Sequence, residues 1–394
     1  MQASIDGFWR GVQRGGLVLG LTLAGTLGTL AAPPVLRSDL GQGNPVEALP
    51  AASPHWLWVN DIVFAHMPDG KAHLVDGDSG KYLGQLNTGF GYGRMLLSPD
   101  GATIYSPETY FSRGTRGTRQ DIVAYYDAKT LEPTGETLIP PKRSSNLAVS
   151  ANAQLTDDGR FLLIYFFNPA QSVGVVDVTA RKWVGEIETP GCALVYPAAP
   201  RAFFSLCADG AVQLINLNEQ GTLSKQRRIE NLLAVDKDPV DEEPVRYQGS
   251  WLFSTFAGSI VPVSANAQAV TAGQPWWLTT PAERAAQWRP GGHQKMALSP
   301  ALNRLYVLML KGGPDTHKDP AQEVWVYDLA THAKIQRIHL QGLASSILVT
   351  RDDKPLLYTA FLGGSDIGVY DARSGKQLRT IHEVATTPTL LVGR

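Results

Sequence analysis

Short β-rich stretches that end in a polar residue and a turn recur along the whole chain. Seven of them can be distinguished, and their turn residues are Asp76, Asp127, Asp177, Asn216, Ser264, Asp328 and Asp371. Successive turn residues lie 39 to 64 residues apart. A period of about 40–50 residues with several strands in each unit is typical of a β-propeller. The repeat therefore predicts an all-β fold, a seven-bladed β-propeller, with the fifth turn residue as the poorest match to the pattern.

Each repeat unit contains more than one strand. Asp-Gly and Pro-Asp pairs, which favour tight turns, separate alternating apolar runs at 97–107 and 155–166. Such a unit gives a blade of about four antiparallel strands. Residues 387–394 read as a single strand with no following hairpin, and 55–61 read as a blade that lacks its innermost strand. We therefore expect the N- and C-terminal strands to pair and close the ring, because a linear array would leave open sheet edges.

The composition fits one large globular array. The chain has 394 residues, of which 43% are hydrophobic and 18% are charged. These fractions are ordinary for a globular protein. The formal net charge of −1 gives no electrostatic reason to expect binding to nucleic acid or to an anionic membrane. One short helix is predicted inside the array, at 281–288, where a proline occupies the first position.

The N-terminus has the pattern of a secretory signal peptide. Arg10 and Arg14 precede an uncharged, Leu-rich run, and small residues occupy positions 29 and 31, which favours cleavage after Ala31. The alternative is an uncleaved anchor, but the apolar core at 17–32 is short for a membrane span of about 20 residues. Export predicts a periplasmic location. The expected order is a signal peptide, an N-terminal arm and the propeller, at residues 1–31, 32–54 and 55–394.

The chain contains two cysteines, Cys192 and Cys207. Residues 192–207 can fold as a hairpin with its turn at about 197–202. In such a hairpin, residues whose numbers sum to 399 face each other, so the two cysteines lie opposite one another. An exported chain with one such pair is expected to form the disulfide, which would contribute about 3 kcal/mol to stability by loop entropy. The alternative is a pair of buried free thiols. Two cysteines cannot build a cysteine-rich zinc or iron–sulfur site.

The common catalytic motifs are missing from the sequence. It contains no G-x-S-x-G elbow, no P-loop and no H-E-x-x-H pair. The glycine-rich segment 88–93 is followed by no βαβ unit, so we interpret it as a turn. His66 and His73, with Asp69 between them, could bind a metal ion, but two histidines without a third ligand are more often surface or hydrogen-bonded residues. We therefore predict no metal site and no catalytic residues in this chain.

Two loop features could contact a partner. Arg113, Arg116 and Arg119 fall in one predicted hairpin loop. They could bind a carboxylate or a partner surface, because arginine is enriched in interfaces, or they could simply be solvated. Phe64 follows the first strand in an apparent loop. A loop phenylalanine is usually a packing plug, but it could instead line a pocket or contact a partner.

Several segments resemble the heavy (large) subunit of the quinone-dependent amine dehydrogenases, namely the aromatic amine and methylamine dehydrogenases. Segments 63–67 and 140–143, with the sequences VFAHM and PPKR, look closer to the aromatic amine branch. The matching segments occur in the expected order over most of the chain, at 59–67, 109–133, 138–143, 168–178, 191–210, 288–309, 316–328 and 378–381.

This resemblance implies a specific function. The heavy subunit of that family is a seven-bladed propeller without a cofactor, in a periplasmic assembly of two heavy and two light chains. The light chain carries tryptophan tryptophylquinone, a primary amine is oxidised to an aldehyde and ammonia, and the electrons pass to a small blue copper protein. The family's heavy-chain phenylalanine in the substrate channel matches Phe64, and its cysteine pair matches Cys192 and Cys207. The resemblance favours an aralkylamine over methylamine, and the alternative is a stand-alone periplasmic binding propeller without a redox partner.

Overall fold

The computed structural model describes residues 47–394. The predicted signal peptide, its cleavage position after Ala31 and most of the predicted arm at 32–54 lie outside these residues. Almost all regular structure within 47–394 is β-strand, as the repeat predicts. None of the helices in this part of the chain has the length and apolar character that a membrane span requires.

The strands pair with their sequence neighbours in antiparallel sets of about four. The first set runs in the order β30-β1-β2-β3, and the second contains β4 to β7. One parallel pair, Gly89 opposite Thr109, joins the two sets into a single sheet. The strands of these sets are β1 (Trp56–Asp61), β2 (Gly70–Asp76), β3 (Tyr82–Gly89), β4 (Leu96–Leu97), β5 (Thr103–Phe111), β6 (Arg119–Asp127), β7 (Pro133–Ile139) and β30 (Pro388–Val392).

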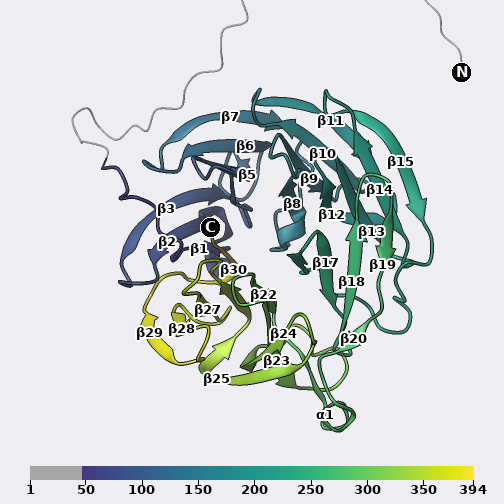
Figure 1. Cartoon of the computed structure of the whole chain (residues 1–394). Helices are drawn as coiled ribbons and strands as arrows, with labels where there is room; N and C mark the ends of the chain where they lie inside the picture. Colours follow the sequence, from purple (N-terminus) through teal and green to yellow (C-terminus); the bar gives the residue numbers. More distant parts are fainter. Residues whose placement is uncertain (1–46) are drawn as a thin grey trace, which may run out of the picture. The chain divides into compact units, whose positions relative to one another are not determined.

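Five further sets each form a sheet of their own (Figure 1). The third and fourth sets comprise β8 (Ala153–Leu155), β9 (Phe161–Phe166), β10 (Ser172–Asp177), β11 (Lys182–Glu188), β12 (Cys192–Ala199), β13 (Ala202–Cys207), β14 (Val212–Leu217) and β15 (Leu223–Ile229). The fifth comprises β16 (Val245–Tyr247), β17 (Ser250–Ser254), β18 (Ser259–Ala265), β19 (Val270–Ala272) and β20 (Trp276–Trp277). The last two comprise β21 (Trp288–Pro290), β22 (Met296–Ser299), β23 (Arg304–Lys311), β24 (Ala321–Asp328), β25 (Lys334–Ala344), β26 (Ser346–Val349), β27 (Leu356–Ala360), β28 (Ile367–Asp371) and β29 (Gln377–Ile381).

The hydrophobic core lies between consecutive strand sets. Trp58 and Leu74 of the first set cluster with Ile104 of the second. Comparable apolar clusters lie between each later pair of neighbouring sets. A further cluster joins the last set to the first, because Leu57 packs with Tyr358. Strands buried on both faces in this way read as near-continuous apolar runs, which is why the strand segments of this sequence are rich in Val, Leu, Ile and Tyr.

The first and last strands of the described chain pair, as the sequence predicts. β30 lies antiparallel to β1, with Val59 opposite Leu391 and Asn60 opposite Leu390. The Asn60 side-chain amide donates to the Leu390 carbonyl at 3.1 Å, and the Thr389 hydroxyl donates to the Asn60 carbonyl at 2.9 Å. The C-terminal strand therefore covers the inner edge of β1 (Figure 1).

The turn residues differ from the prediction at two of the seven positions. The Asp127 carboxylate accepts from the backbone N–H groups of Lys129 and Thr130 at 2.8 and 2.9 Å. Equivalent bonds are made by Asp76, Asp177, Asp328 and Asp371. In the fourth and fifth units the prediction of Asn216 and Ser264 is wrong. Asn218 and Asn266 fill this role two residues later, because asparagine provides the same side-chain oxygen for the turn.

The predicted helix is present but shorter than expected. α1 spans Pro281–Ala285, and a capping box between Thr280 and Glu283 fixes its start. Gln287 adopts a left-handed conformation with φ 62°, which ends the helical turn before β21 begins. The remaining helical segments in the described chain are two 3₁₀ turns, η1 (Phe64–Asp69) and η2 (Ser150–Asn152).

The pairing of β30 with β1 can be tested by truncating a side chain in β30. Leu391→Ala should lower the free energy of unfolding by about 2–5 kcal/mol, because Leu391 is 2% exposed and packs between the last and first sets. The matched control is Leu378→Ala in β29, which is 44% exposed and should cost less than about 0.5 kcal/mol. Urea unfolding followed by fluorescence measures both, and equal losses would contradict the packing of β30 described above.

Candidate functional site

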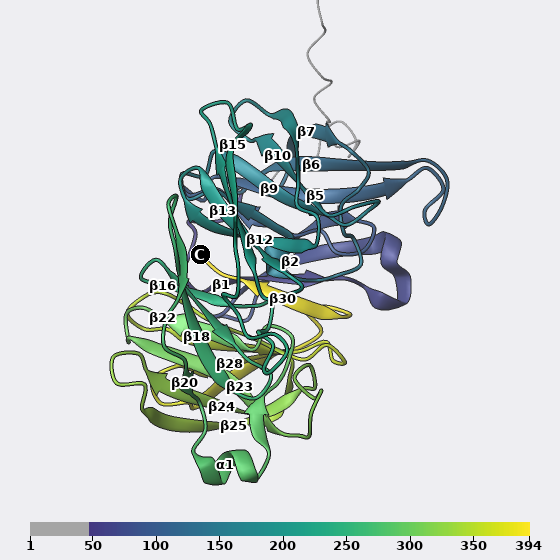
Figure 2. The ribbon, with the colours of Figure 1, turned by 90° about the vertical axis from the view of Figure 1, so that its right-hand side faces the viewer.

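The candidate site lies where several connections between strands gather, a surface that we call the loop face. We define the loop face by residues 62–69, 112–118, 140–152 and 167–171. Backbone hydrogen bonds from the neighbouring segment 88–93 reach two of these segments: Gly91 donates to the Met67 carbonyl and Tyr92 to the Ser145 carbonyl, both at 2.7 Å. A third segment is tied to the second, because Phe167 donates to the Lys142 carbonyl at 3.2 Å. Figure 2 shows the β1–β2 turn and the β5–β6 hairpin projecting on the same side.

Phe64 projects from the loop face. It begins η1, and its side chain is 66% exposed, which makes it the most exposed large hydrophobic residue in the described chain. The preceding residue, Val63, has φ 47° and ψ 61°. This left-handed conformation is unfavourable for a β-branched residue and persists only where surrounding contacts enforce it. Phe64 therefore does not act as a packing plug, and its position depends on a strained turn.

The carboxylate of Asp61 holds that turn. Its Oδ1 accepts from the backbone N–H groups of Val63 at 2.9 Å and Thr387 at 2.8 Å, and its Oδ2 accepts from Thr386 at 2.6 Å. Asp61 is 2% exposed. Burial alone would raise the pKa of Asp61, but the hydrogen bonds from His73 and these backbone groups outweigh it and lower the pKa below its usual 3.8. The carboxylate is therefore charged at neutral pH.

The two histidines that the sequence offered as metal ligands have separate roles. His73 Nε2 lies 3.3 Å from Asp61 Oδ2, and its Nδ1 lies 2.8 Å from the Tyr82 hydroxyl. Asp69 forms an ion pair with Lys71 at 2.7 Å. His66 is exposed within η1. His73 therefore belongs to the support of the Phe64 turn, and residues 47–394 contain no group of three metal-binding side chains.

The glycine-rich segment 88–93 is a packed turn. A Cβ atom on Gly91 would lie 2.2 Å from the Ser145 carbonyl oxygen, so only glycine fits at this position. The buried Arg143 guanidinium donates to the Tyr92 carbonyl at 2.7 Å. Burial lowers the pKa of Arg143 to about 10, with Asp121 opposing the shift, so the side chain remains charged. This segment thus connects the Phe64 turn to residues 140–152.

The three loop arginines separate into two kinds. Arg113 and Arg116 are exposed in the turn between β5 and β6. Arg119 instead forms a two-point ion pair with buried Asp121, at 2.8 and 2.7 Å, and donates to the Arg143 carbonyl at 2.7 Å. Arg119 is therefore a structural residue at the base of the hairpin, whereas Arg113 and Arg116 lie in its exposed turn.

A cavity of about 620 Å³ opens beside this hairpin. Its walls include Arg119, Leu147, Phe167 and Glu242. The Leu147 side chain is 44% exposed and that of Phe167 is 55% exposed. Together with Phe64, they place three exposed apolar side chains on the loop face.

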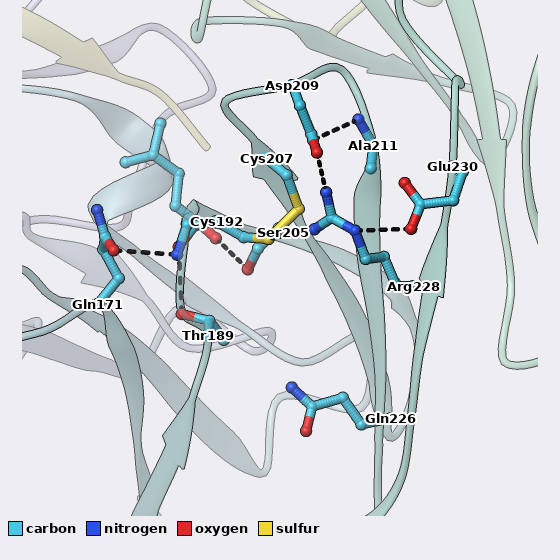
Figure 3. Close-up of a disulfide and its surroundings, with 12 residues drawn as sticks. Gln171, Thr189, Cys192, Ser205, Cys207, Asp209, Ala211, Gln226, Arg228 and Glu230 are labelled. Carbon is cyan, nitrogen blue, oxygen red and sulfur yellow. Dashed lines mark hydrogen bonds and ion pairs between the residues drawn. A yellow bond between two sulfur atoms is a disulfide. The ribbon is translucent and has the colours of Figure 1, made fainter.

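The predicted disulfide is present. Cys192 Sγ and Cys207 Sγ are bonded, and the two residues are directly paired between β12 and β13. The predicted register, in which the numbers of paired residues sum to 399, holds for the two cysteines. After Ala193 a bulge shifts the pairing by one residue and then by two as the strands approach the turn. Arg228, which forms ion pairs with Asp209 and Glu230, lies beside the disulfide (Figure 3).

Comparison with known proteins assigns the family. A sequence profile described as "Methylamine dehydrogenase heavy chain (MADH)" matches residues 55–393. The chain belongs to the methylamine dehydrogenase heavy chain family. The resemblance to amine dehydrogenase heavy subunits that the sequence indicated is thereby confirmed.

Individual heavy chains resemble this one along nearly their whole length. The methylamine dehydrogenase heavy chain of Methylophilus methylotrophus is 30% identical over 386 residues, which cover 96% of this chain and 94% of that one. The heavy chain of Methylobacillus flagellatus is 28% identical, with 94% of this chain and 91% of that one covered. This level of identity is enough to assign the family. The amine in the names of these relatives describes those enzymes and is not carried over to this chain.

Solved structures of lower identity resemble the fold. The β-propeller domain of Cps50 (Swd1) from Myceliophteria thermophila aligns with a TM-score of 0.54 at 10% identity, covering 86% of this chain and 100% of that one. Dihydro-heme d1 dehydrogenase NirN aligns with a TM-score of 0.52 at 15% identity, covering 89% of this chain and 77% of that one. These structural similarities support a propeller-like all-β fold. They carry no information about activity.

Asp61 and Thr387 are the site residues that reasoning from sequence missed. Asp61 ends the first strand. An aspartate side chain can accept from the backbone N–H two residues later, here that of Val63, so the sequence could have indicated a turn at this point. Thr387 gave no such signal, because it meets Phe64 only after the two ends of the described chain come together.

Removing the disulfide should destabilise the protein without unfolding it. Replacing both cysteines by alanine should lower the free energy of unfolding by about 3 kcal/mol, because the bond closes a loop with a sequence separation of 15. Urea unfolding measures the loss, and the reduced wild-type protein is the control that leaves both side chains in place. Equal stability of oxidised and reduced protein would contradict this role.

The charge on Asp61 should make the stability of this region depend on pH. Since its folded pKa lies below 3.8, its contribution is present above about pH 4 and is lost as the pH falls through the folded pKa. Asp61→Asn should therefore lower the free energy of unfolding by about 2 kcal/mol at pH 7, and the difference from wild type should shrink at pH 3. Urea unfolding at both pH values tests this, and a pH-independent difference would argue against a charged Asp61.

Proposed function

We propose that the strand sets are the seven blades of a closed β-propeller. Three observations support this: the sets contain about four antiparallel strands each, apolar clusters fill the space between consecutive sets, and β30 completes the first set from the other end of the chain. A closed propeller is a rigid scaffold that presents loops at two ends. Any function is then expected in those loops or in a partner that they hold.

We infer that the chain is the non-catalytic heavy subunit of a periplasmic amine dehydrogenase. The observation that carries this proposal is the family match over residues 55–393. In the proposed assembly, two heavy and two light chains oxidise a primary amine, with water, to an aldehyde and ammonia. The tryptophan tryptophylquinone that accepts the electrons belongs to the light subunit, and a small blue copper protein takes them onward. The basic, Leu-rich N-terminus at 1–31 supports export to the periplasm.

The light subunit is proposed to bind the loop face. Three large apolar side chains, Phe64, Leu147 and Phe167, are exposed there, and the hairpin adds the exposed Arg113 and Arg116. Aromatic residues and arginines are enriched in protein interfaces, and apolar side chains exposed together on one surface are typical of an interaction site. With the light subunit in place, Phe64 would line the path by which the amine reaches the quinone.

The amine is proposed to be an aralkylamine. Segments 63–67 and 140–143 support this preference, whereas the relatives described above are methylamine dehydrogenase heavy chains. The substituent is the part of a primary amine that a hydrophobic channel residue can select, since the amino group must reach the quinone in every substrate. Both substrate classes therefore belong in any assay of the assembly.

The proposal is tested by isolating the tagged chain from its native host. We expect it to co-purify with a small chain that has quinone absorbance, and the complex should reduce a dye when an amine is added. Leu147→Asp on the loop face should lower recovery of the small chain at least tenfold, whereas Leu378→Asp, equally exposed at 44% on β29, should not. A colourless chain without a partner would favour a stand-alone binding propeller, and activity of the pure chain alone would contradict a non-catalytic subunit.

A further inference from the structure

Phe64 is held by the opposite end of the described chain. Its backbone N–H donates to the Thr387 hydroxyl at 3.1 Å, across 323 positions of sequence. The Asp61 carboxylate accepts from Thr386 and Thr387, the two residues that immediately precede β30. One carboxylate and one hydroxyl thus tie the Phe64 turn to the strand that pairs with β1.

These contacts explain how an exposed ring can have a fixed position. Phe64 gains little from packing, since two thirds of its side chain is exposed. The left-handed Val63 would relax toward a more favourable conformation if its N–H lost the Asp61 acceptor. Thr387 is 8% exposed and Asp61 is 2% exposed, so both side chains are shielded from water that would compete for these hydrogen bonds.

We propose that Asp61 and Thr387 are positioning residues that fix Phe64 in the wall of the amine channel and thereby set the preference for the amine substituent. This inference rests on the proposed function, because it needs a channel beside Phe64. A fixed ring presents one surface to the substituent, whereas a ring on a loosened turn samples several positions and binds a bulky substituent less well. Methylamine carries too small a substituent to use that surface.

Thr387 offers a matched pair of variants that keep the fold. Thr387→Val has nearly the same shape but cannot accept from the Phe64 N–H, whereas Thr387→Ser keeps the hydroxyl. In the assembled enzyme, Thr387→Val should raise KM for 2-phenylethylamine threefold or more while kcat and KM for methylamine change less than twofold. Thr387→Ser should stay within twofold of wild type for both amines. Asp61→Asn should change the ratio of KM for 2-phenylethylamine to KM for methylamine in the same direction as Thr387→Val.

A second measurement needs no partner and no activity. Amide hydrogen exchange of the Phe64–Ala65 segment in the heavy chain alone should be at least tenfold faster in Thr387→Val than in wild type or Thr387→Ser. Unchanged exchange would overturn the role of Thr387 in holding the turn, whatever the kinetics show.

The kinetic outcomes separate this inference from the proposed function. Faster exchange with an altered KM ratio supports the inference. Suppose that exchange is faster in Thr387→Val while the ratio of KM for 2-phenylethylamine to KM for methylamine stays unaltered. If Phe64→Ala does change that ratio, the inference is overturned, because Phe64 then selects amines without support from Thr387. If Phe64→Ala also leaves the ratio unaltered, the channel role of Phe64 fails, and the inference falls with it.

Discussion

The antiparallel pairing of β1 with β30 is the constraint on which the rest of the described structure depends. Side chains of Asn60 and Thr389 reinforce it with hydrogen bonds across about 330 positions of sequence. The same pairing brings Leu391 into the apolar cluster between the last and first strand sets. Without it, β1 would be an open edge and that cluster would face water. The Phe64 turn would also lose its support, because Thr386 and Thr387 lead directly into β30.

The loop face combines fixed backbone positions with exposed apolar side chains. The scaffold supplies fixed positions: Asp61 and Thr387 fix the Phe64 turn, and Arg143 fixes the glycine-rich segment beside it. It also leaves the side chains of Phe64, Leu147 and Phe167 exposed on the loop face. Both properties suit the function proposed above, in which the chain holds a light subunit and shapes the path of a small amine.

Local patterns in the sequence predicted what depends on neighbouring residues. The Cys192–Cys207 pair followed from a short hairpin, and Asp127 and its equivalents from the turn that an aspartate makes with its own backbone. The pairing of Arg119 with Asp121 was missed, although residues two apart in a strand share one face and it could have been deduced. Asn216 and Ser264 were chosen wrongly because a second polar residue stands two positions later. The contact of Thr387 with Phe64 could not be predicted, because no local pattern relates positions so far apart.

We propose above all that the loop face binds the quinone-bearing light subunit. Amide hydrogen exchange of the chain, measured with and without the light subunit purified from the native host, tests it most directly. We expect the light subunit to slow exchange in the Phe64 turn, the 112–118 hairpin, residues 140–152 and residues 167–171, and to leave the turns at Asp76, Asp127 and Asp177 unchanged. Slower exchange confined to those aspartate turns, with none at the loop face, would contradict it.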